Sequence, residues 1–495
     1  SDKNDLSGLP NELIETASAD AKAKGKAGKW VFTLSNSSVM PFLQYSSNRK
    51  LRKEIWNAYQ MRANNGNDKD NKSLAIKIAN LRGEKARLLG YATHADYVLE
   101  KSMAKNPETA NKLLNDLWIP ALNMANKEAA DIQKMMQKEG INEPVQPYDW
   151  RYYTEKIRKE RFDLDEQEMK PYFSLEKTRE GVFTVCKNLY GLQFKQLNNV
   201  PKYHEDVTVW EVTEANGSHV GILYMDFHPR TSKRGGAWMT SYRTQKMENG
   251  KRVAPVVSIV CNFTKPTENA PALLTFDEVS TFFHEFGHAL HGLLSNVTYE
   301  SVAGTSVPRD FVELPSQIME NWAAEPEVMK MYAKHYKTGE IIPDVLIEKM
   351  QKAGTFDQGF VTTEYLAASI LDMAYHTQKA DITSDAETFE KEAMNKINLP
   401  STIIPRYRST YFNHIFAGGY SAGYYSYIWS GVLDTDAFEV FKINGLFNSD
   451  YAKSFRKNVL EKGGTEDPME LYKSFRGAEP SVEPLLRKRG LDQVK

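Results

Sequence analysis

Residues 275–293 restrict the fold most, because they predict a helix that is apolar on almost every side. The sequence Thr275-Phe276-Asp277-Glu278 is a capping box, in which the first and last residues satisfy each other's backbone N–H groups at a helix start. The apolar residues that follow are Val279, Phe282, Phe283, Phe286, Leu290 and Leu293. Such a helix is stable only when other elements cover it, and a chain of 495 residues can supply that core.

Two histidines and a glutamate lie in the middle of this helix, in His284-Glu285-Phe286-Gly287-His288. Histidines four residues apart point the same way, so both imidazoles can reach one metal ion at about 2.0 to 2.1 Å, with Glu285 beside them as a base. The alternative to metal binding is that the two histidines lie on a solvent-exposed face of the helix. The apolar surroundings argue against it, because buried histidines beside a buried glutamate are costly without a partner. Gly287 costs about 1 kcal/mol in a helix interior, which indicates that something approaches the backbone there.

A catalytic site of this kind needs a third protein ligand and a position for water. His291 lies on the same helix, and three ligands from one straight helix cannot surround an ion, so we expect it to be near the site or solvated. Some zinc sites take their third histidine from a fixed position further along the chain after the pair. That pattern fails here, because position 294 is leucine. Glu313 is the better candidate, because a second helix is expected through residues 318–322. Packed across the first helix, it would bring a ligand to the ion from a direction that the two histidines do not cover. Candidates for bracing a histidine are Asp277, Glu320 or a backbone carbonyl.

The first third of the chain predicts helices. Residues 48–62 and 73–89 have amphipathic spacing, and another helix is expected after Asn106, because asparagine caps helices and Pro107 suits the first helical position. Residues 140–147 are the clearest break and a candidate domain boundary.

A β region follows the first helices. Residues 207–212 and 219–227 predict a hairpin around Asn216-Gly217, and residues 252–263 predict another strand. From about residue 275 the pattern is helical again, apart from a glycine- and tyrosine-rich stretch at 418–427.

Charge and cysteine content exclude several classes of protein. Lys and Arg number 63 and Asp and Glu 64, so there is no electrostatic reason to expect a nucleic-acid or membrane partner. No apolar run reaches the roughly 18 residues that a membrane span needs. Cys186 and Cys261 are too few for a disulfide scaffold and fit a reducing compartment. We expect a cytoplasmic monomer; since Ser1 is not an initiator methionine, a periplasmic protein that has lost an export segment is the alternative.

Several motifs together resemble the thimet oligopeptidase family of zinc metallopeptidases. They are HEFGHALH at 284–291, TSVPRDFVELPSQ at 305–317, HIFAGGYSAGYYSYIWS at 414–430, GKWVFTL at 28–34 and GGAWM at 235–239. Within the family, the second and third motifs are most similar to those of bacterial peptidyl-dipeptidases. Family members are typically longer at the amino end, so an N-terminal helical segment is expected to be missing here.

The resemblance implies a mainly α fold with a small β-sheet, shaped as a two-lobed ellipsoid with a deep channel and a zinc-binding HExxH core on its floor. We expect residues 1–50 to form an arm on the catalytic lobe and residues 51–165 a helical lobe along one channel wall. Residues 166–495 would be the catalytic lobe, with about 345–385 returning to the helical lobe.

The resemblance also implies roles for the tyrosine-rich stretch. Tyr427 and Tyr424 would stabilise the oxyanion and hold the substrate backbone, with Tyr420 and His414 nearby. The structural alternative is that these are core fillers, since the chain has 25 tyrosines.

The implied activity is hydrolysis of short unstructured peptides by water activated at one zinc ion, held by His284, His288 and Glu313, with release of C-terminal dipeptides. A free substrate carboxylate would then need a cation, for which Arg309 is the first candidate and Arg230, Lys233 and Arg234 are alternatives. The extended segment 253–263, or the neighbour carrying GGAWM, would hold substrate as an added strand.

Two other functions remain open at this stage. One is an endo-acting oligopeptidase, which would cut inside short peptides. The other is an inactive peptide-binding scaffold, which would have no need of a base beside a metal site. Manganese or cobalt would also suit the same ligands.

Overall fold

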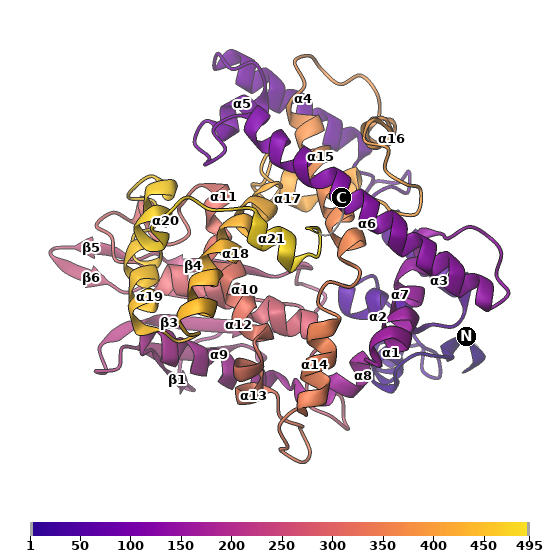
Figure 1. Cartoon of the computed structure of the whole chain (residues 1–495), viewed down its shortest axis with the longest axis horizontal. Helices are drawn as coiled ribbons and strands as arrows, with labels where there is room; N and C mark the ends of the chain where they lie inside the picture. Colours follow the sequence, from indigo (N-terminus) through magenta and orange to yellow (C-terminus); the bar gives the residue numbers. More distant parts are fainter. Residues whose placement is uncertain (1–2, 493–495) are drawn as a thin grey trace. The chain divides into compact units, whose positions relative to one another are not determined.

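The structure is a computed structural model that describes residues 3–492. The chain divides into two compact units: unit 1 runs to Leu164 and includes residues 352–429 and the segment from Leu486, and unit 2 comprises residues 165–351 and 430–485. Both units are rich in helices and only unit 2 contains named strands among the described residues, so the predicted mainly α fold with a small sheet is confirmed (Figure 1). None of the helices within residues 3–492 is long and apolar enough to cross a membrane.

Unit 1 is built from helices. Its helices are α1 (Asn11–Ala23), α2 (Asn36–Tyr45), α3 (Arg49–Gln60), α4 (Lys72–Leu88), α5 (His94–Leu99), α6 (Pro107–Lys138), α7 (Pro147–Phe162), α15 (Gln358–His376), α16 (Ala386–Lys396) and α17 (Asn413–Phe416). Three further helices cross the boundaries of the units in sequence: α18 (Ser426–Asn444), α21 (Glu483–Lys488) and α14 (Asp344–Lys352), of which only the last residue belongs to unit 1.

Helices α6 and α15 pack together at the centre of unit 1. As predicted, the Asn106 side chain caps α6 by accepting the N–H of Thr109 at 2.8 Å. The two helices lie so close that a β-carbon on Gly359 would be 2.4 Å from the backbone nitrogen of Ala125. Apolar side chains fill the space around this contact: Ala125, Ile132, Met136, Trp150, Tyr153, Ile157 and Phe360.

Residues 1 and 2 of the expected arm lie outside the described residues, and residues 3–50 belong to unit 1. Leu9, Leu13 and Phe42 form one apolar cluster, against which Leu51 and Ile55 of α3 pack. The helices of this segment have apolar faces that α3 covers. The arm is therefore part of the helical unit.

Unit 2 contains a five-stranded sheet in the order β1-β2-β3-β7-β4. The strands are β1 (Gln193–Leu197), β2 (Thr208–Thr213), β3 (His219–Asp226), β4 (Trp238–Arg243) and β7 (Val256–Val260), with a separate hairpin of β5 (Lys246–Glu248) and β6 (Lys251–Val253). β3 and β7 are parallel, and the other pairs are antiparallel. The hairpin predicted around Asn216-Gly217 is confirmed as β2 and β3.

The single strand expected at residues 252–263 is wrong, because the chain changes sheets within it. Residues 251–253 pair with β5, whereas residues 256–260 form β7 of the main sheet. Pro255 lies between them, and proline has no N–H to donate to a ladder. The split leaves β7 as a short inner strand with β3 and β4 on its two sides.

The remaining helices lie in unit 2. They are α8 (Glu166–Met169), α9 (Leu175–Tyr190), α10 (Phe276–Leu293), α11 (Arg309–Val312), α12 (Leu314–Ala324), α13 (Pro326–Tyr332), α19 (Ser449–Phe455) and α20 (Pro468–Arg476). Helix α10 packs against β7, β4 and β3 and also against α12 (Figure 1). The helix with the histidine pair therefore lies between the sheet and the helix that follows Glu313.

Candidate metal centre

Helix α10 begins as the sequence predicts. The Thr275 hydroxyl accepts the N–H of Glu278 at 3.2 Å, and the Glu278 carboxylate accepts the N–H of Thr275 at 2.9 Å. Glu278 also accepts the N–H of Thr264 at 2.7 Å, which ties the preceding loop to the helix start. All six apolar side chains predicted for the buried side are fully buried.

Three side chains meet in unit 2 as a candidate metal-binding cluster: His284, His288 and Glu313, with their ligand atoms within 4.8 Å of one another. The Nε2 atoms of His284 and His288 lie 3.3 Å and 3.0 Å from the same oxygen of Glu313. The two imidazole rings are 5.0 Å apart and almost perpendicular. One carboxylate oxygen and two ring nitrogens therefore converge on one small volume.

This spacing fits a tetrahedral ion. Ligands bound at about 2.0 to 2.1 Å in tetrahedral geometry lie about 3.4 Å from one another, close to the nitrogen-to-oxygen distances of this cluster. A His2Glu set supplies three protein ligands and leaves the fourth position for water or substrate. The donor set and the spacing both suit a catalytic zinc ion.

A close crossing of α10 and α12 places Glu313. The two helices cross at Gly287, which has no side chain. A β-carbon there would lie 2.1 Å from the carbonyl oxygen of Pro315. The close approach indicated by this glycine therefore comes from the backbone of the second helix. The Ser316 hydroxyl donates at 3.0 Å to the Glu313 oxygen that faces both histidines, and it lies 2.9 Å from the Glu313 carbonyl.

Glu320 braces the first histidine. Its carboxylate lies 2.6 Å from Nδ1 of His284, so this nitrogen carries the proton and Nε2 is directed at the cluster. Of the candidates from the sequence, Glu320 is the one in contact, because it lies two turns after Glu313 on the packed face of α12. Asp277 is exposed in the first turn of α10 and contributes to the helix start instead.

Glu285 lies beside the ligands without joining them. Its side chain is 3% exposed, and one carboxylate oxygen has no hydrogen-bond partner. Burial raises the pKa of this carboxyl, while the nearby His284 and His288 oppose the rise. A buried carboxylate with a free oxygen and a raised pKa has the properties of a general base.

His291 is outside the cluster and is not solvated, so of its two predicted places, near the site or solvated, the second is wrong. The residue is fully buried, and neither ring nitrogen has a hydrogen-bond partner. Burial lowers its pKa to about 3, helped by the nearby charge of His288. His291 is therefore a neutral imidazole packed on the inner side of α10.

Interactions within the cluster shift the pKa values of its members. Burial lowers the pKa of His284, but hydrogen bonds with Glu313 and Glu320 outweigh it and raise the pKa well above its usual value. Burial by itself would raise the pKa of Glu313, but the two histidines hold it well below the usual range. The Glu313 carboxylate is therefore stabilised in its charged form.

The predicted tyrosines belong to unit 1, because residues 352–429 are part of that unit. The catalytic lobe expected at 166–495 is therefore interrupted over a longer stretch than 345–385. Within unit 1, the ring of Tyr427 stacks on Tyr420 at 5.3 Å and lies 5.4 Å from Tyr424 and 6.2 Å from His414. These four side chains form one aromatic group, and their roles toward a substrate stay predictions.

The candidate cations for a substrate carboxylate differ in how they are engaged. Arg230 and Lys233 both bind the buried Asp226 carboxylate, at 2.8 Å and 3.0 Å. Arg309 is exposed at the start of α11, and Arg234 is exposed with its guanidinium over the ring of Trp238 at 4.3 Å. The two exposed arginines are the better placed candidates.

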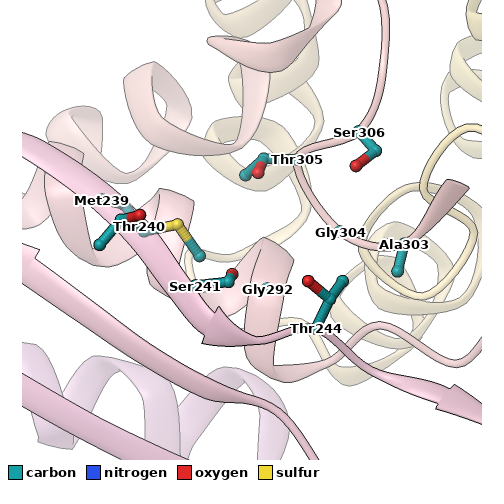
Figure 2. A pocket seen from close by; sticks show the side chains of 9 residues that line it. All are labelled: Met239, Thr240, Ser241, Thr244, Gly292, Ala303, Gly304, Thr305 and Ser306. Atoms are coloured by element: carbon teal, nitrogen blue, oxygen red, sulfur yellow. The ribbon is translucent and has the colours of Figure 1, made fainter. Parts of the chain in front are cut away.

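The free edge of the main sheet lies next to α10. β4, which begins within GGAWM, is the last strand on its side of the main sheet, whereas β7 of the other expected segment is an inner strand; within residues 3–492 the outer edge of β4 therefore has no neighbouring strand. A hollow of about 250 Å³ lies beside it, between β4 and the 303–306 loop, with Gly292 of α10 between them (Figure 2). Gly292 lies one turn after His288, so the hollow adjoins the cluster along the helix.

The fold and the cluster define the class of this protein, namely the mainly helical metallopeptidases with a HExxH helix. Residues 42–491 match the family described as Peptidase family M3, and the chain belongs to that family. It is a peptidase by this membership.

Curated relatives in this family include two bacterial enzymes. Dipeptidyl carboxypeptidase of Escherichia coli (strain K12) is 40% identical over 491 residues, which are 98% of this chain and 72% of that protein. Oligopeptidase A of the same organism is 38% identical over 502 residues, covering 99% and 73%. Among solved structures, one titled PZ peptidase A with inhibitor 2 has a TM-score of 0.56 at 16% identity, covers 98% of this chain and 75% of that one, and shares the fold.

Proposed function

We propose that this chain is a zinc-dependent peptidase that hydrolyses short peptides and releases C-terminal dipeptides. The observation that carries the proposal is the convergence of two ring nitrogens on one oxygen of Glu313, at 3.0 Å and 3.3 Å. His284, His288 and Glu313 would hold the ion. A zinc ion in such a site supplies a Lewis acid that activates water and polarises a carbonyl.

Glu285 is the general base in this proposal. Its unpartnered oxygen accepts the proton of the attacking water and then delivers that proton to the leaving amine. Burial favours this transfer, because it raises the pKa of the Glu285 carboxyl and so strengthens it as a proton acceptor, although the nearby His284 and His288 oppose the rise.

The substrate backbone binds along the free edge of β4. Main-chain hydrogen bonds to a sheet edge need no particular side chain, which suits peptides of varied sequence. The hollow lined by Ser241, Thr244, Gly292 and Thr305 would accept one substrate side chain. Replacing successive amide hydrogens of a peptide substrate by methyl groups tests this mode, because only those bonded to the strand should raise KM.

Tyr427 and Tyr424 stabilise the oxyanion in this proposal. Burial raises the pKa of the Tyr424 phenol well above its usual value, so it remains a proton donor at all working pH values. Loss of one oxyanion donor commonly lowers kcat by about 10² to 10³. Tyr427→Phe and Tyr424→Phe are therefore expected to reduce kcat while zinc content stays unchanged.

Dipeptide release is favoured over internal cleavage by the higher identity to dipeptidyl carboxypeptidase than to oligopeptidase A. The test compares one peptide with a free and an amidated carboxyl end. A peptidyl-dipeptidase slows markedly on the amide, and Arg309→Ala or Arg234→Ala should abolish that preference if either residue binds the carboxylate. Equal rates on both peptides would instead establish an endo-acting oligopeptidase.

Metal dependence is tested by removing zinc with a chelator and restoring it. Cleavage of a fluorogenic peptide should disappear and return with about one zinc per chain. Activity that persists without metal contradicts the proposal, and metal binding without any cleavage would favour the scaffold alternative.

A further inference from the structure

The segment of residues 414–427, called here the tyrosine segment, is anchored within unit 1 by one buried carboxylate. This carboxylate belongs to Asp372 of α15, which is fully buried. Residues 417–425 belong to no helix or strand, and their path depends on turn hydrogen bonds within the segment, such as Gly423 N–H to the Tyr420 carbonyl at 2.9 Å, together with contacts from other elements. The hydrogen bonds to Asp372 are concentrated at its centre.

Three successive backbone N–H groups converge on Asp372. The amide of Ala422 donates to Oδ1 at 2.9 Å, and those of Gly423 and Tyr424 donate to Oδ2 at 2.9 Å and 2.8 Å. Consecutive N–H groups that point to one anion form a nest, whose usual occupant is a bound phosphate or sulfate. Here the anion is an internal side chain. Ala422 adopts a φ of 50°, in the left-handed region, so this conformation depends on the anion that holds it.

A histidine and an arginine hold the carboxylate itself. Nδ1 of His376 lies 2.8 Å from Oδ1 of Asp372 and 2.9 Å from the Asp372 carbonyl, so this nitrogen faces two acceptors and carries the proton. Nε2 then accepts from the guanidinium of Arg82 on α4, at 3.1 Å. The same Arg82 nitrogen donates to the carbonyl of Ile415 at 2.8 Å, near the start of the segment.

The hydrogen bonds of the carboxylate are complete. A carboxylate has about four acceptor positions, and three backbone amides and His376 fill them. The Ala422 nitrogen also lies 3.3 Å from Nδ1 of His376, but a protonated Nδ1 cannot accept, so its partner is the carboxylate. No position on Asp372 remains for a ligand or for proton transfer, which assigns it to holding the segment.

The anchored backbone carries the aromatic group. Tyr424 is itself one of the three residues that donate to Asp372, and Tyr427 follows three residues later. The Tyr365 hydroxyl accepts the N–H of Ile428 at 3.1 Å and donates to the Tyr424 carbonyl, so it fixes the chain just beyond the nest. A shift of residues 422–424 would therefore move the rings of Tyr424 and Tyr427 together.

We propose that Asp372 is a positioning residue for the peptidase reaction, which holds Tyr424 and Tyr427 in place through the Ala422–Tyr424 backbone. This inference rests on the proposed function, because it requires that the tyrosines act on the substrate. It assigns to His376 and Arg82 the task of fixing the carboxylate.

Asp372→Asn tests the inference. Asparagine has the same shape, but its NH2 group would face N–H donors and leave at least one of them unpaired. Because a displacement of about 1 Å at a reacting group can cost about 10² in rate, kcat/KM should fall about 100-fold. Zinc content should stay at that of the parent enzyme, and hydrogen exchange should accelerate at residues 420–424.

Asp149→Asn is the matched control. Asp149 is also a fully buried carboxylate in unit 1, where it accepts from Arg49 at 2.8 Å, from Arg52 at 3.2 Å and from the Gln146 amide at 3.1 Å. It anchors the start of α7 and not the tyrosine segment. A comparable loss of stability is expected, with kcat/KM within about threefold of the parent.

A double-mutant cycle separates positioning from general damage. In a background that carries both Tyr424→Phe and Tyr427→Phe, Asp372→Asn should cost far less than in the parent, because both donors that it misplaces are already absent. Full multiplication of the two losses would overturn the inference, as would unchanged activity of Asp372→Asn. If Tyr427→Phe and Tyr424→Phe alone have no effect, the proposed role of the tyrosines fails instead, and the two failures are thereby distinguished.

His376→Asn provides the same test if Asp372→Asn does not fold. Its amide nitrogen replaces Nδ1 as a donor but removes the link to Arg82, so the carboxylate stays and becomes less constrained. A smaller loss of kcat/KM is expected, with the same non-additivity toward the combined Tyr424→Phe and Tyr427→Phe replacement, and simple multiplication would overturn the inference.

Discussion

Gly287 and Pro315 bring the two halves of the metal centre together, because a β-carbon on Gly287 would lie 2.1 Å from the Pro315 carbonyl oxygen. Gly287 lies between the two histidines on α10, and Pro315 lies two residues after Glu313. The distance between ligands from different helices therefore depends on a missing side chain.

Gly287→Ala is expected to weaken metal binding. The added methyl group forces α12 away from α10 and moves Glu313 with it, so zinc affinity should fall at least tenfold in chelator competition. Helix propensity alone would favour alanine by about 1 kcal/mol, so a loss identifies the crossing as its cause. Gly235→Ala is the control, since nothing lies within 4 Å of its β-carbon position and affinity should not change.

Glu320→Ala should reduce zinc affinity without removing a ligand. Glu320 fixes the ring of His284 through Nδ1 at 2.6 Å, and loss of such a partner typically costs about 10 to 100-fold in metal affinity. Isothermal titration of the metal-free protein with zinc measures the change. Asp277→Ala removes an exposed carboxylate from the same region and should leave the affinity unaltered, and equal effects of the two substitutions would refute the bracing role.

Glu285→Gln should abolish most turnover while zinc remains bound. General base catalysis contributes about 10² to 10⁴ in rate, and glutamine keeps the size of the side chain but cannot accept the proton. Turnover of a fluorogenic peptide and zinc content by atomic absorption are measured on the same preparation. A kcat within a few-fold of the parent would show that another group is the base.

Zinc uptake should release a proton from His284. In the metal-free protein its pKa is raised well above the usual value of about 6.5, so it is protonated at pH 7, and a metal ligand must be neutral. Zinc affinity is therefore expected to rise about tenfold per pH unit until the raised pKa is passed. Titrations in buffers of different ionisation enthalpy count the protons, and a count of zero contradicts the assignment.

The raised pKa of His284 also makes the stability of the metal-free protein fall as the pH rises. The folded-state pKa of His284 lies above the unfolded one, so protonation stabilises the metal-free fold fully below about pH 6.5. This contribution disappears as the pH rises through the raised pKa. Chemical denaturation of metal-free protein at pH 6 and above the transition measures it, and Glu320→Ala should reduce the difference because one of the two stabilising carboxylates is gone.

Local signals in the sequence predict the metal helix well, because the chemistry of its start and of its ligands is local. The Thr275 capping box and the i, i+4 histidines need only helix geometry, and both are present as predicted. Glu313 is predicted from the need for a ligand on a second helix, and its side chain lies beside both histidines in the cluster. Glu320 stood among three candidates, since sequence spacing alone does not show which carboxylate meets an imidazole on another helix.

What the sequence alone determined is the type of chemistry: the HExxH helix, its burial and its family resemblance follow from residue types at fixed spacing. Only the tertiary structure decided which distant groups complete it. The break at Pro255, the burial of His291 and the placement of the tyrosine segment in unit 1 all depend on contacts between residues far apart in the chain. Asp372 shows the reason: His376 one turn later on the same helix is a local partner, but the role of the carboxylate emerges only when residues 422–424, far away in the sequence, fold back onto it.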